Sequence, residues 1–118
     1  MKIFLACPVR NADINDRIAQ ETQVRFLESQ GHEVHWPPRD TNQDDSTGLR
    51  ICQDNRTAIE EADTVYVIWD GTSQGVLFDL GVAFALRKPI QTIKGYMPAP
   101  THGKSIQNMI YAWEEWGE

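Results

Sequence analysis

Asp79 is the only charged residue in the apolar segment 75–86, and it is the residue of this chain best placed to do chemistry. A carboxylate among apolar side chains is costly to bury unless it is hydrogen-bonded, neutralised or held at a cleft edge. A ligand could approach it closely, because Gly75 lies one helical turn before it and has no side chain. We expect an anion at pH 7 that acts as a nucleophile or stabilises positive charge. The plainer alternative is an acid that caps a turn or meets solvent.

The polar turn at residues 71–75 precedes the expected helix that carries Asp79. Free backbone N–H groups at a helix start could hold an anion or sugar hydroxyls. The turn matches neither the P-loop nor the dinucleotide-binding fingerprint, since the glycine spacing differs and no Gly-Lys-Ser/Thr follows. Ser73 is equally well explained as a simple N-cap.

Other polar residues fall near the same expected loops. Arg10, Arg39 and Arg56 could each bind a phosphate or carboxylate through two parallel hydrogen bonds, or could form surface ion pairs. Asp54 and Asn55 offer an acid and an amide on one helix, with a solvated helix start as the alternative. Histidines and cysteines show no metal-ligand spacing, so we predict no metal and no cofactor. Cys7 is expected to be a small buried residue rather than a nucleophile.

Composition places limits on the class of protein. The chain has 118 residues and a net charge of −6, which predicts one domain over residues 1–118 and argues against nucleic-acid binding. No segment reaches the roughly 20 apolar residues of a membrane span, and no signal-peptide pattern is visible. Two cysteines without paired spacing fit a reducing compartment. We therefore expect a cytoplasmic protein with no membrane association.

Strand-like and helix-like segments alternate along the chain. Strands are expected at residues 2–6, 32–36, 65–69 and 89–93, and helices at 13–29, 49–62, 76–86 and 104–116. Residues 39–48 have the composition of a loop, either functional or disordered. This order predicts an α/β fold with a parallel sheet of four or five strands, covered by helices on both faces. Ligands should bind beyond the carboxyl ends of the strands, at 7–11, 37–41, 69–75 and after Ile93.

Several segments together resemble the nucleoside 2-deoxyribosyltransferase family over nearly the whole chain. They are residues 2–8, 55–63 and 65–70, the motif Gly75-x-x-x-Asp79-Leu-Gly81-x-Ala83, and Lys88-Pro-Ile. The resemblance implies a flavodoxin-like three-layer domain. It also implies a nucleoside or nucleotide substrate, because the family includes relatives that hydrolyse deoxynucleoside 5′-monophosphates.

The resemblance assigns the nucleophile to Asp79. In the family a carboxylate attacks the anomeric carbon, releases the base and forms a glycosyl-enzyme ester, which a second base or water then resolves. Here Asp79 stands where the family usually has the longer Glu, and Phe4 stands in place of an aromatic hydroxyl. Asn55, beside Asp54, and Ser73 occupy positions where the family carries acids. Both can still hydrogen-bond a sugar or a base.

Binding residues follow from the resemblance and from the expected sheet edge. Arg10 and Asn11 fit the turn that holds a 5′-phosphate, and the loop at 39–48 could close as a lid. Further substrate-binding candidates lie near the strand ends: Phe4, Cys7, Arg39, Asp70, Ser73 and Gly75. The family is dimeric or higher, and Asn108, or Gln107 beside it, would complete a neighbour's site. Trp113 and Trp116 are candidate interface anchors, although core packing explains one of them equally well.

The sequence thus predicts cleavage or exchange of the N-glycosidic bond of a nucleoside or nucleoside 5′-monophosphate. A non-catalytic nucleotide-binding or sensing module on the same fold is the first alternative. A purely structural or interaction role, with the tryptophan-bearing helix as the contact surface, is the second.

Overall fold

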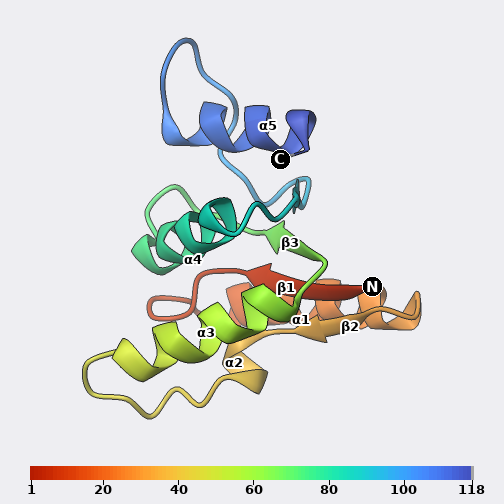
Figure 1. Ribbon diagram of the computed structural model, residues 1–118, viewed down its shortest axis with the longest axis vertical. Helices are drawn as coiled ribbons and strands as arrows, with labels where there is room; N and C mark the ends of the chain where they lie inside the picture. Colours follow the sequence, from red (N-terminus) through yellow and green to blue (C-terminus); the bar gives the residue numbers. More distant parts are fainter. Residues whose placement is uncertain (118) are drawn as a thin grey trace.

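The computed structural model describes residues 1–117 as alternating strands and helices (Figure 1). Their order is β1 (Lys2–Ala6), α1 (Ile14–Ser29), β2 (Glu33–His35), α2 (Pro37–Asp40), α3 (Leu49–Glu61), β3 (Thr64–Val67), α4 (Gln74–Ala85), β4 (Ile90–Thr92) and α5 (Ile106–Trp116). In this part of the chain the strands form one parallel sheet in the order β2-β1-β3-β4. The predicted α/β class with a parallel sheet is confirmed.

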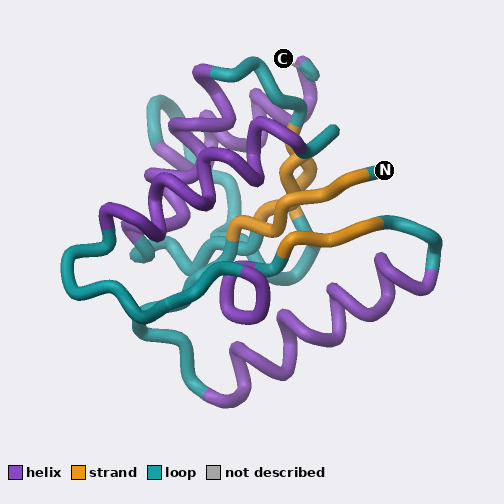
Figure 2. The backbone as a smooth tube through the Cα atoms, turned by 60° about the horizontal axis from the view of Figure 1, so that its bottom comes forward, coloured by secondary structure: helices purple, strands orange, loops and turns teal. Residues whose placement is uncertain are grey.

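The sheet separates two apolar layers. Helices lie on both sides of the strands in Figure 2. Ile3 and Leu5 of β1 pack toward α1, whereas Phe4 and Ala6 pack toward α3, α4 and α5. This alternation follows from the two-residue period of a strand, and it makes β1 apolar on both faces. Helices therefore cover both faces, as predicted. No helix within residues 1–117 is long and apolar enough to cross a membrane.

Element boundaries differ from the sequence prediction at two places that matter for the site. A short helix, α2, follows β2, in a segment where the sequence predicted none, and it begins with Pro37 and Pro38. Proline suits the first turn of a helix because its missing N–H would have no partner there. Asp40 closes this turn by accepting a hydrogen bond from Trp36 N at 2.9 Å. The chain then turns inward and buries Thr41.

The second difference concerns α4, which begins at Gln74 rather than Val76. Ser73 is its N-cap, and Ser73 Oγ accepts a hydrogen bond from Val76 N at 3.4 Å. Asp79 consequently lies in the second turn of the helix, one turn deeper than a capping position.

The segment between α2 and α3 is tied to its surroundings by hydrogen bonds. Arg50 Nη2 donates to the carbonyl oxygens of Asn42 and Asp44, at 2.6 and 3.2 Å. Asp45 accepts a hydrogen bond from Ile51 N at 3.1 Å, at the start of α3. Gly48 caps this helix with a φ of 85°, a left-handed conformation that favours glycine.

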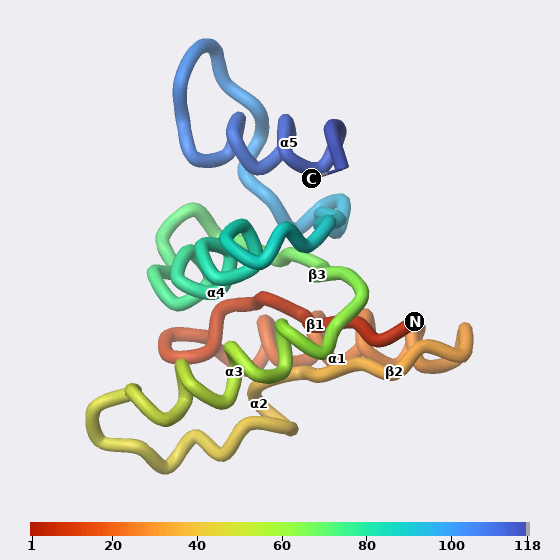
Figure 3. Tube along the Cα trace, viewed as in Figure 1, coloured from red at the N-terminus to blue at the C-terminus, as the bar shows by residue number. Residues whose placement is uncertain are grey.

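The carboxyl ends of the strands meet at one edge of the sheet, where the loop after β1 and the starts of α3 and α4 gather (Figure 3). Gln20 of α1 fixes the loop after β1 by donating to Pro8 O at 2.9 Å. The same side chain accepts a hydrogen bond from Trp36 Nε1 at 3.0 Å, so it also links the ends of β1 and β2. This edge is the predicted location of the site.

Candidate functional site

Asp79 is buried on the inner face of α4, with 8 % of its surface exposed. Val76 and Ala83 are buried on the same helix at spacings of three and four residues, so the helical period carries Asp79 inward with them. The alternative of an acid at a cap or in solvent is therefore wrong. The side chain faces α3, where Asn55 donates a hydrogen bond to it.

The surroundings of Asp79 change its proton affinity. Burial raises the pKa of its carboxyl group from 3.8 to about 7, although the hydrogen bond from Asn55 acts in the opposite direction. At pH 7 the group is therefore divided between its ionised and protonated forms, rather than fully ionised as the sequence suggested. A carboxyl with this pKa can serve as a nucleophile in one form and exchange a proton near neutral pH.

Asn55 is itself buried, and its amide is held from the other side. Thr41 Oγ1 donates to Asn55 Oδ1 at 2.8 Å, and His35 Nε2 lies 2.8 Å from the same Thr41 oxygen. Four side chains from the ends of β2, α2, α3 and α4 thus form one connected polar set. Sequence reasoning singled out Asp79 and Asn55. It placed Thr41 only within the expected binding edge 37–41 and gave His35 no role, because the hydrogen bonds that join them to Asn55 connect segments distant in sequence.

Phe4 and Cys7 provide the apolar surroundings of this polar set. Phe4 is fully buried, and its ring stacks on His35 with centroids 5.5 Å apart. Burial raises the pKa of the Cys7 thiol to about 12, and the nearby Asp79 charge raises it further, so Cys7 is a neutral thiol at pH 7. Burial and the same charge raise the pKa of Cys52. Neither environment favours a thiolate nucleophile.

The β3–α4 turn carries a second aspartate, Asp70, which is exposed. Its Oδ1 accepts hydrogen bonds from Thr72 N at 2.8 Å and from Ser73 N at 2.7 Å. Partial burial would raise the Asp70 pKa, but these backbone hydrogen bonds outweigh it, and the pKa is lowered. A Cβ atom at Gly75 would meet nothing within 4 Å, so the surface in front of this helix turn is open to a ligand.

Two of the predicted site residues, Arg39 and Asp54, form ion pairs with other side chains. Arg39 bonds Glu28 and Asp40, at 3.1 and 2.9 Å, and also donates to Val34 O, which directs it toward α1. Asp54 pairs with Arg50 at 2.7 Å on the outer side of α3. Neither side chain is a hydrogen-bond or ion-pair partner of Asp79 within residues 1–117, although both charges act on the pKa of His35.

The remaining predicted residues form no hydrogen bond or ion pair with Asp79 among residues 1–117. Arg10 and Asn11 are in the turn after β1, and Arg10 makes none of the ion pairs found within residues 1–117. Arg56 is exposed on α3. Asn108 bonds the loop that precedes its own helix, accepting from Thr101 N and donating to the carbonyl oxygens of Thr101 and Gly103.

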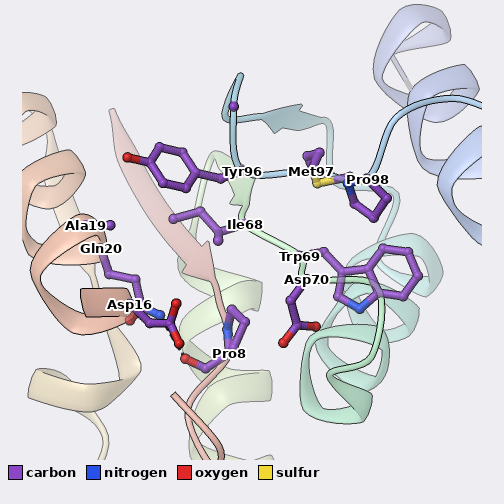
Figure 4. A pocket seen from close by; sticks show the side chains of 11 residues that line it. Pro8, Asp16, Ala19, Gln20, Ile68, Trp69, Asp70, Tyr96, Met97 and Pro98 are labelled. Atoms are coloured by element: carbon purple, nitrogen blue, oxygen red, sulfur yellow. Dashed lines mark hydrogen bonds between the residues drawn. The ribbon is translucent and has the colours of Figure 1, made fainter. Parts of the chain in front are cut away.

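A cavity of about 380 Å³ opens at the same sheet edge, between α1 and the loop after β4 (Figure 4). Asp70 lies beside Pro8 in this view, and Tyr96 and Met97 lie across from Gln20. The described lining residues include Asp70 but not Asp79. Within residues 1–117, no group of three or more His, Cys, Asp or Glu side chains is placed to hold a metal ion.

Comparison with known proteins relates this fold to one family. A family model described as nucleoside 2-deoxyribosyltransferase matches residues 3–108. Among solved structures, a 2-deoxyribosyltransferase from the psychrotolerant bacterium Bacillus psychrosaccharolyticus is similar with a TM-score of 0.73 and 21 % identity, over 98 % of this chain and 90 % of that one. A CMP N-glycosidase from Clostridium botulinum is similar with a TM-score of 0.55 and 24 % identity, over 78 % of this chain and 67 % of that one. A comparison with curated proteins found no match.

Proposed function

The chain belongs to the nucleoside 2-deoxyribosyltransferase family, and from that premise we propose that it cleaves or exchanges the N-glycosidic bond of a nucleoside or nucleoside 5′-monophosphate, with Asp79 as the nucleophile. The observation that carries this proposal is a buried carboxyl group with a pKa of about 7 at the carboxyl edge of a parallel sheet. The similar solved structures include a 2-deoxyribosyltransferase and a CMP N-glycosidase, whose names describe these two outcomes.

The proposed reaction proceeds by two displacements at the anomeric carbon. The ionised Asp79 carboxylate attacks that carbon, and the electrons of the breaking C–N bond leave with the base, which takes up a proton from water. The resulting glycosyl ester is then attacked by water or by a second base, which regenerates the carboxylate. Retention of configuration follows from the two inversions.

Residues around Asp79 would orient the substrate. Asn55 contacts the nucleophile directly, while Ser73 and Gly75 lie at the open start of α4. Asp70 lines the neighbouring cavity and could accept hydrogen bonds from sugar hydroxyls. For a phosphorylated substrate, Arg10 and Asn11 in the turn after β1 remain the proposed phosphate contacts, because Arg10 makes no ion pair with any residue from 1 to 117.

Association into a homodimer or larger assembly is part of the proposal. Helix α5 exposes apolar side chains, with Ile106 43 %, Met109 42 % and Trp116 79 % exposed, and a second copy could cover them. Trp113, by contrast, is buried in the core. Asn108 on the same helix would then contribute to a neighbour's site. Light scattering on the purified protein measures the mass of the assembly directly.

Release of free base tests the proposed reaction. The protein is incubated with a panel of nucleosides and nucleoside monophosphates, with and without an acceptor base, and the products are separated by liquid chromatography. We expect the wild type and the Glu21→Gln control, an exposed ion-pair residue of α1, to release base. Asp79→Ala should release none. Equal release by Asp79→Ala and the wild type would refute the assignment of the nucleophile.

The alternative of a non-catalytic nucleotide-binding module draws on two positions. Asn55 is an amide and Ser73 is a helix cap, where the family resemblance places acids. Under this alternative, calorimetry detects nucleotide binding but no variant releases base. If the protein neither binds nucleotides nor releases base, the remaining candidate is an interaction role for the exposed face of α5.

A further inference from the structure

A line of buried hydrogen bonds connects His35 with Asp79 through Thr41 and Asn55. The side chains of Thr41, Asn55 and Asp79 are 4, 6 and 8 % exposed, so water competes little for their polar atoms. His35 Nε2 lies 2.8 Å from Thr41 Oγ1, which lies 2.8 Å from Asn55 Oδ1. The Asn55 side chain then donates to Asp79. Buried polar networks of this kind act as a unit.

The donor and acceptor capacities of the four side chains determine which group donates in each hydrogen bond. The Thr41 hydroxyl has one proton, which it donates to Asn55 Oδ1. Because the amide oxygen of Asn55 is thereby used, its NH₂ group faces Asp79, and an NH₂ group stabilises a carboxylate. Because the Thr41 proton is used as well, the Thr41 oxygen accepts from His35, which must carry its proton on Nε2.

We propose that His35 and Thr41 are positioning residues, which hold the Asn55 amide with its NH₂ group toward Asp79 and so keep Asp79 available as a carboxylate. Neither residue would touch the substrate. The catalytic consequence rests on the proposed function, whereas the effect on Asp79 ionisation does not.

Protonation of Asp79 should reverse every bond in the line. A protonated carboxyl donates to the Asn55 oxygen, so the amide turns over and its NH₂ group donates to Thr41. The Thr41 hydroxyl then donates to His35 Nε2, which requires the imidazole proton to sit on Nδ1. The tautomer of His35 is thus expected to change at the pH where Asp79 titrates.

His35 is suited to this role because it is fixed and neutral. Its ring stacks on Phe4, its partner in the β1–β2 register, which limits rotation. Burial lowers the His35 pKa; the charges of Asp40, Asp54 and Glu61 raise it, and that of Arg39 lowers it. A neutral imidazole at pH 7 can adopt either tautomer.

The groups facing Asp79 leave Asn55 as its main polar partner. Cys7 from the end of β1 and Cys52 from α3 both sense the Asp79 charge, and burial raises the pKa of each thiol, so both are neutral at pH 7. Replacing Thr41 would therefore release the Asn55 amide without another charged group to compensate. The ionised form of Asp79 should become less favourable.

Carboxyl carbon NMR on the full chain measures this directly, with the Asp79 signal assigned by its loss in Asp79→Asn. The wild type should titrate near pH 7, and Thr41→Val should titrate higher by about one pH unit. Thr41→Ser, which restores a hydroxyl, should titrate as the wild type does. Thr64→Val is the matched control, because Thr64 is a buried threonine whose hydroxyl donates to Pro89 O, away from Asp79. An unchanged midpoint in Thr41→Val would overturn the proposal.

A second measurement needs no variant and covers the case in which Thr41→Val fails to fold. Nitrogen NMR of the wild type should show His35 protonated on Nε2 above pH 8, with the proton moving to Nδ1 as the pH falls through the Asp79 midpoint. A tautomer that stays the same over this range would also overturn the proposal.

Kinetics separate this inference from the proposed function. If base is released, the acidic limb of the pH–rate profile should shift upward in Thr41→Val together with the NMR midpoint, so that activity falls about tenfold at pH 6 and recovers at pH 9. If the NMR midpoint shifts but no variant releases base, the proposed function fails and the positioning role stands. If base is released but neither the limb nor the midpoint moves, the positioning role fails alone.

Discussion

Asp70 and Asp79 lie nine residues apart at the same edge of the sheet, yet their surroundings give them opposite acid–base character. Asp70 is exposed in the β3–α4 turn, where two backbone N–H groups bond its carboxylate and lower its pKa against the effect of partial burial. Asp79 is buried in the second turn of α4, where burial raises its pKa to about 7. Two carboxyl groups with pKa values pushed apart are a common arrangement in sites that transfer glycosyl groups.

The difference shows how local structure divides one residue type between two roles. Asp70 stabilises the turn that starts α4, since its bonds order the backbone just before the N-cap Ser73. Asp79 gains nothing comparable, because the fold places an acid in an apolar layer with one amide donor. A group kept at such a cost is a better candidate for function than one that stabilises its own surroundings.

The largest expected contrast is in activity. Asp79→Asn preserves the shape of the side chain but removes the nucleophile, and it should lower kcat/KM for base release by at least about 10³-fold. Asp70→Asn retains acceptors for the backbone bonds, and its loss should stay below about tenfold. Steady-state assays on both variants make the comparison. A larger loss in Asp70→Asn than in Asp79→Asn would reverse the assigned roles.

Much of this site could be predicted from the sequence because it depends on local patterns. The apolar segment around Asp79 predicted a partly buried carboxylate on a helix, and strand–helix alternation placed that helix at the carboxyl edge of a parallel sheet. An N-cap was one of the two explanations offered for Ser73, and the structure shows that bond.

The rest depends on contacts between segments distant in sequence. Thr41 is buried because α2 turns the chain back toward α3, and the composition of residues 39–48 is typical of a surface loop. Arg39 is directed away from Asp79 by Glu28, eleven residues earlier on α1. Partners of this kind are fixed by how helices pack on the sheet, which a single sequence pattern does not specify.

The next contrast is in the free energy of unfolding, which the ionised Asp79 carboxylate should lower. Its pKa is about 7 in the folded chain and close to 3.8 when unfolded, so between these values the folded state binds more protons. Stability therefore falls as the pH rises through this range, and the loss is complete above about pH 7. Asp79→Asn removes this penalty, so its gain in stability over the wild type should be larger at pH 9 than at pH 5 by about 3 kcal/mol.

Urea unfolding of both proteins at the two pH values measures this difference. Glu21→Gln serves as the control, because its exposed i,i+4 ion pair should contribute little at either pH. A stability gain in Asp79→Asn that is equal at pH 5 and pH 9 would mean that the carboxyl group titrates normally.

The smallest expected effect has the opposite sign and belongs to Asp70. Because its pKa is lower in the folded chain, Asp70 contributes stability above its unfolded pKa and loses it as the pH falls through the folded value. Asp70→Ala should cost about 1 kcal/mol at pH 7, since two backbone N–H groups lose a charged acceptor, and less at pH 3. Asp70→Asn can accept the same hydrogen bonds but does not titrate. It should therefore keep most of the wild-type stability, and residue 70 should add no pH dependence to its unfolding free energy between pH 3 and pH 7. Equal destabilisation of Asp70→Ala at both pH values would show that the carboxylate charge contributes nothing to the turn, and the contrast with Asp79 would then rest on burial alone.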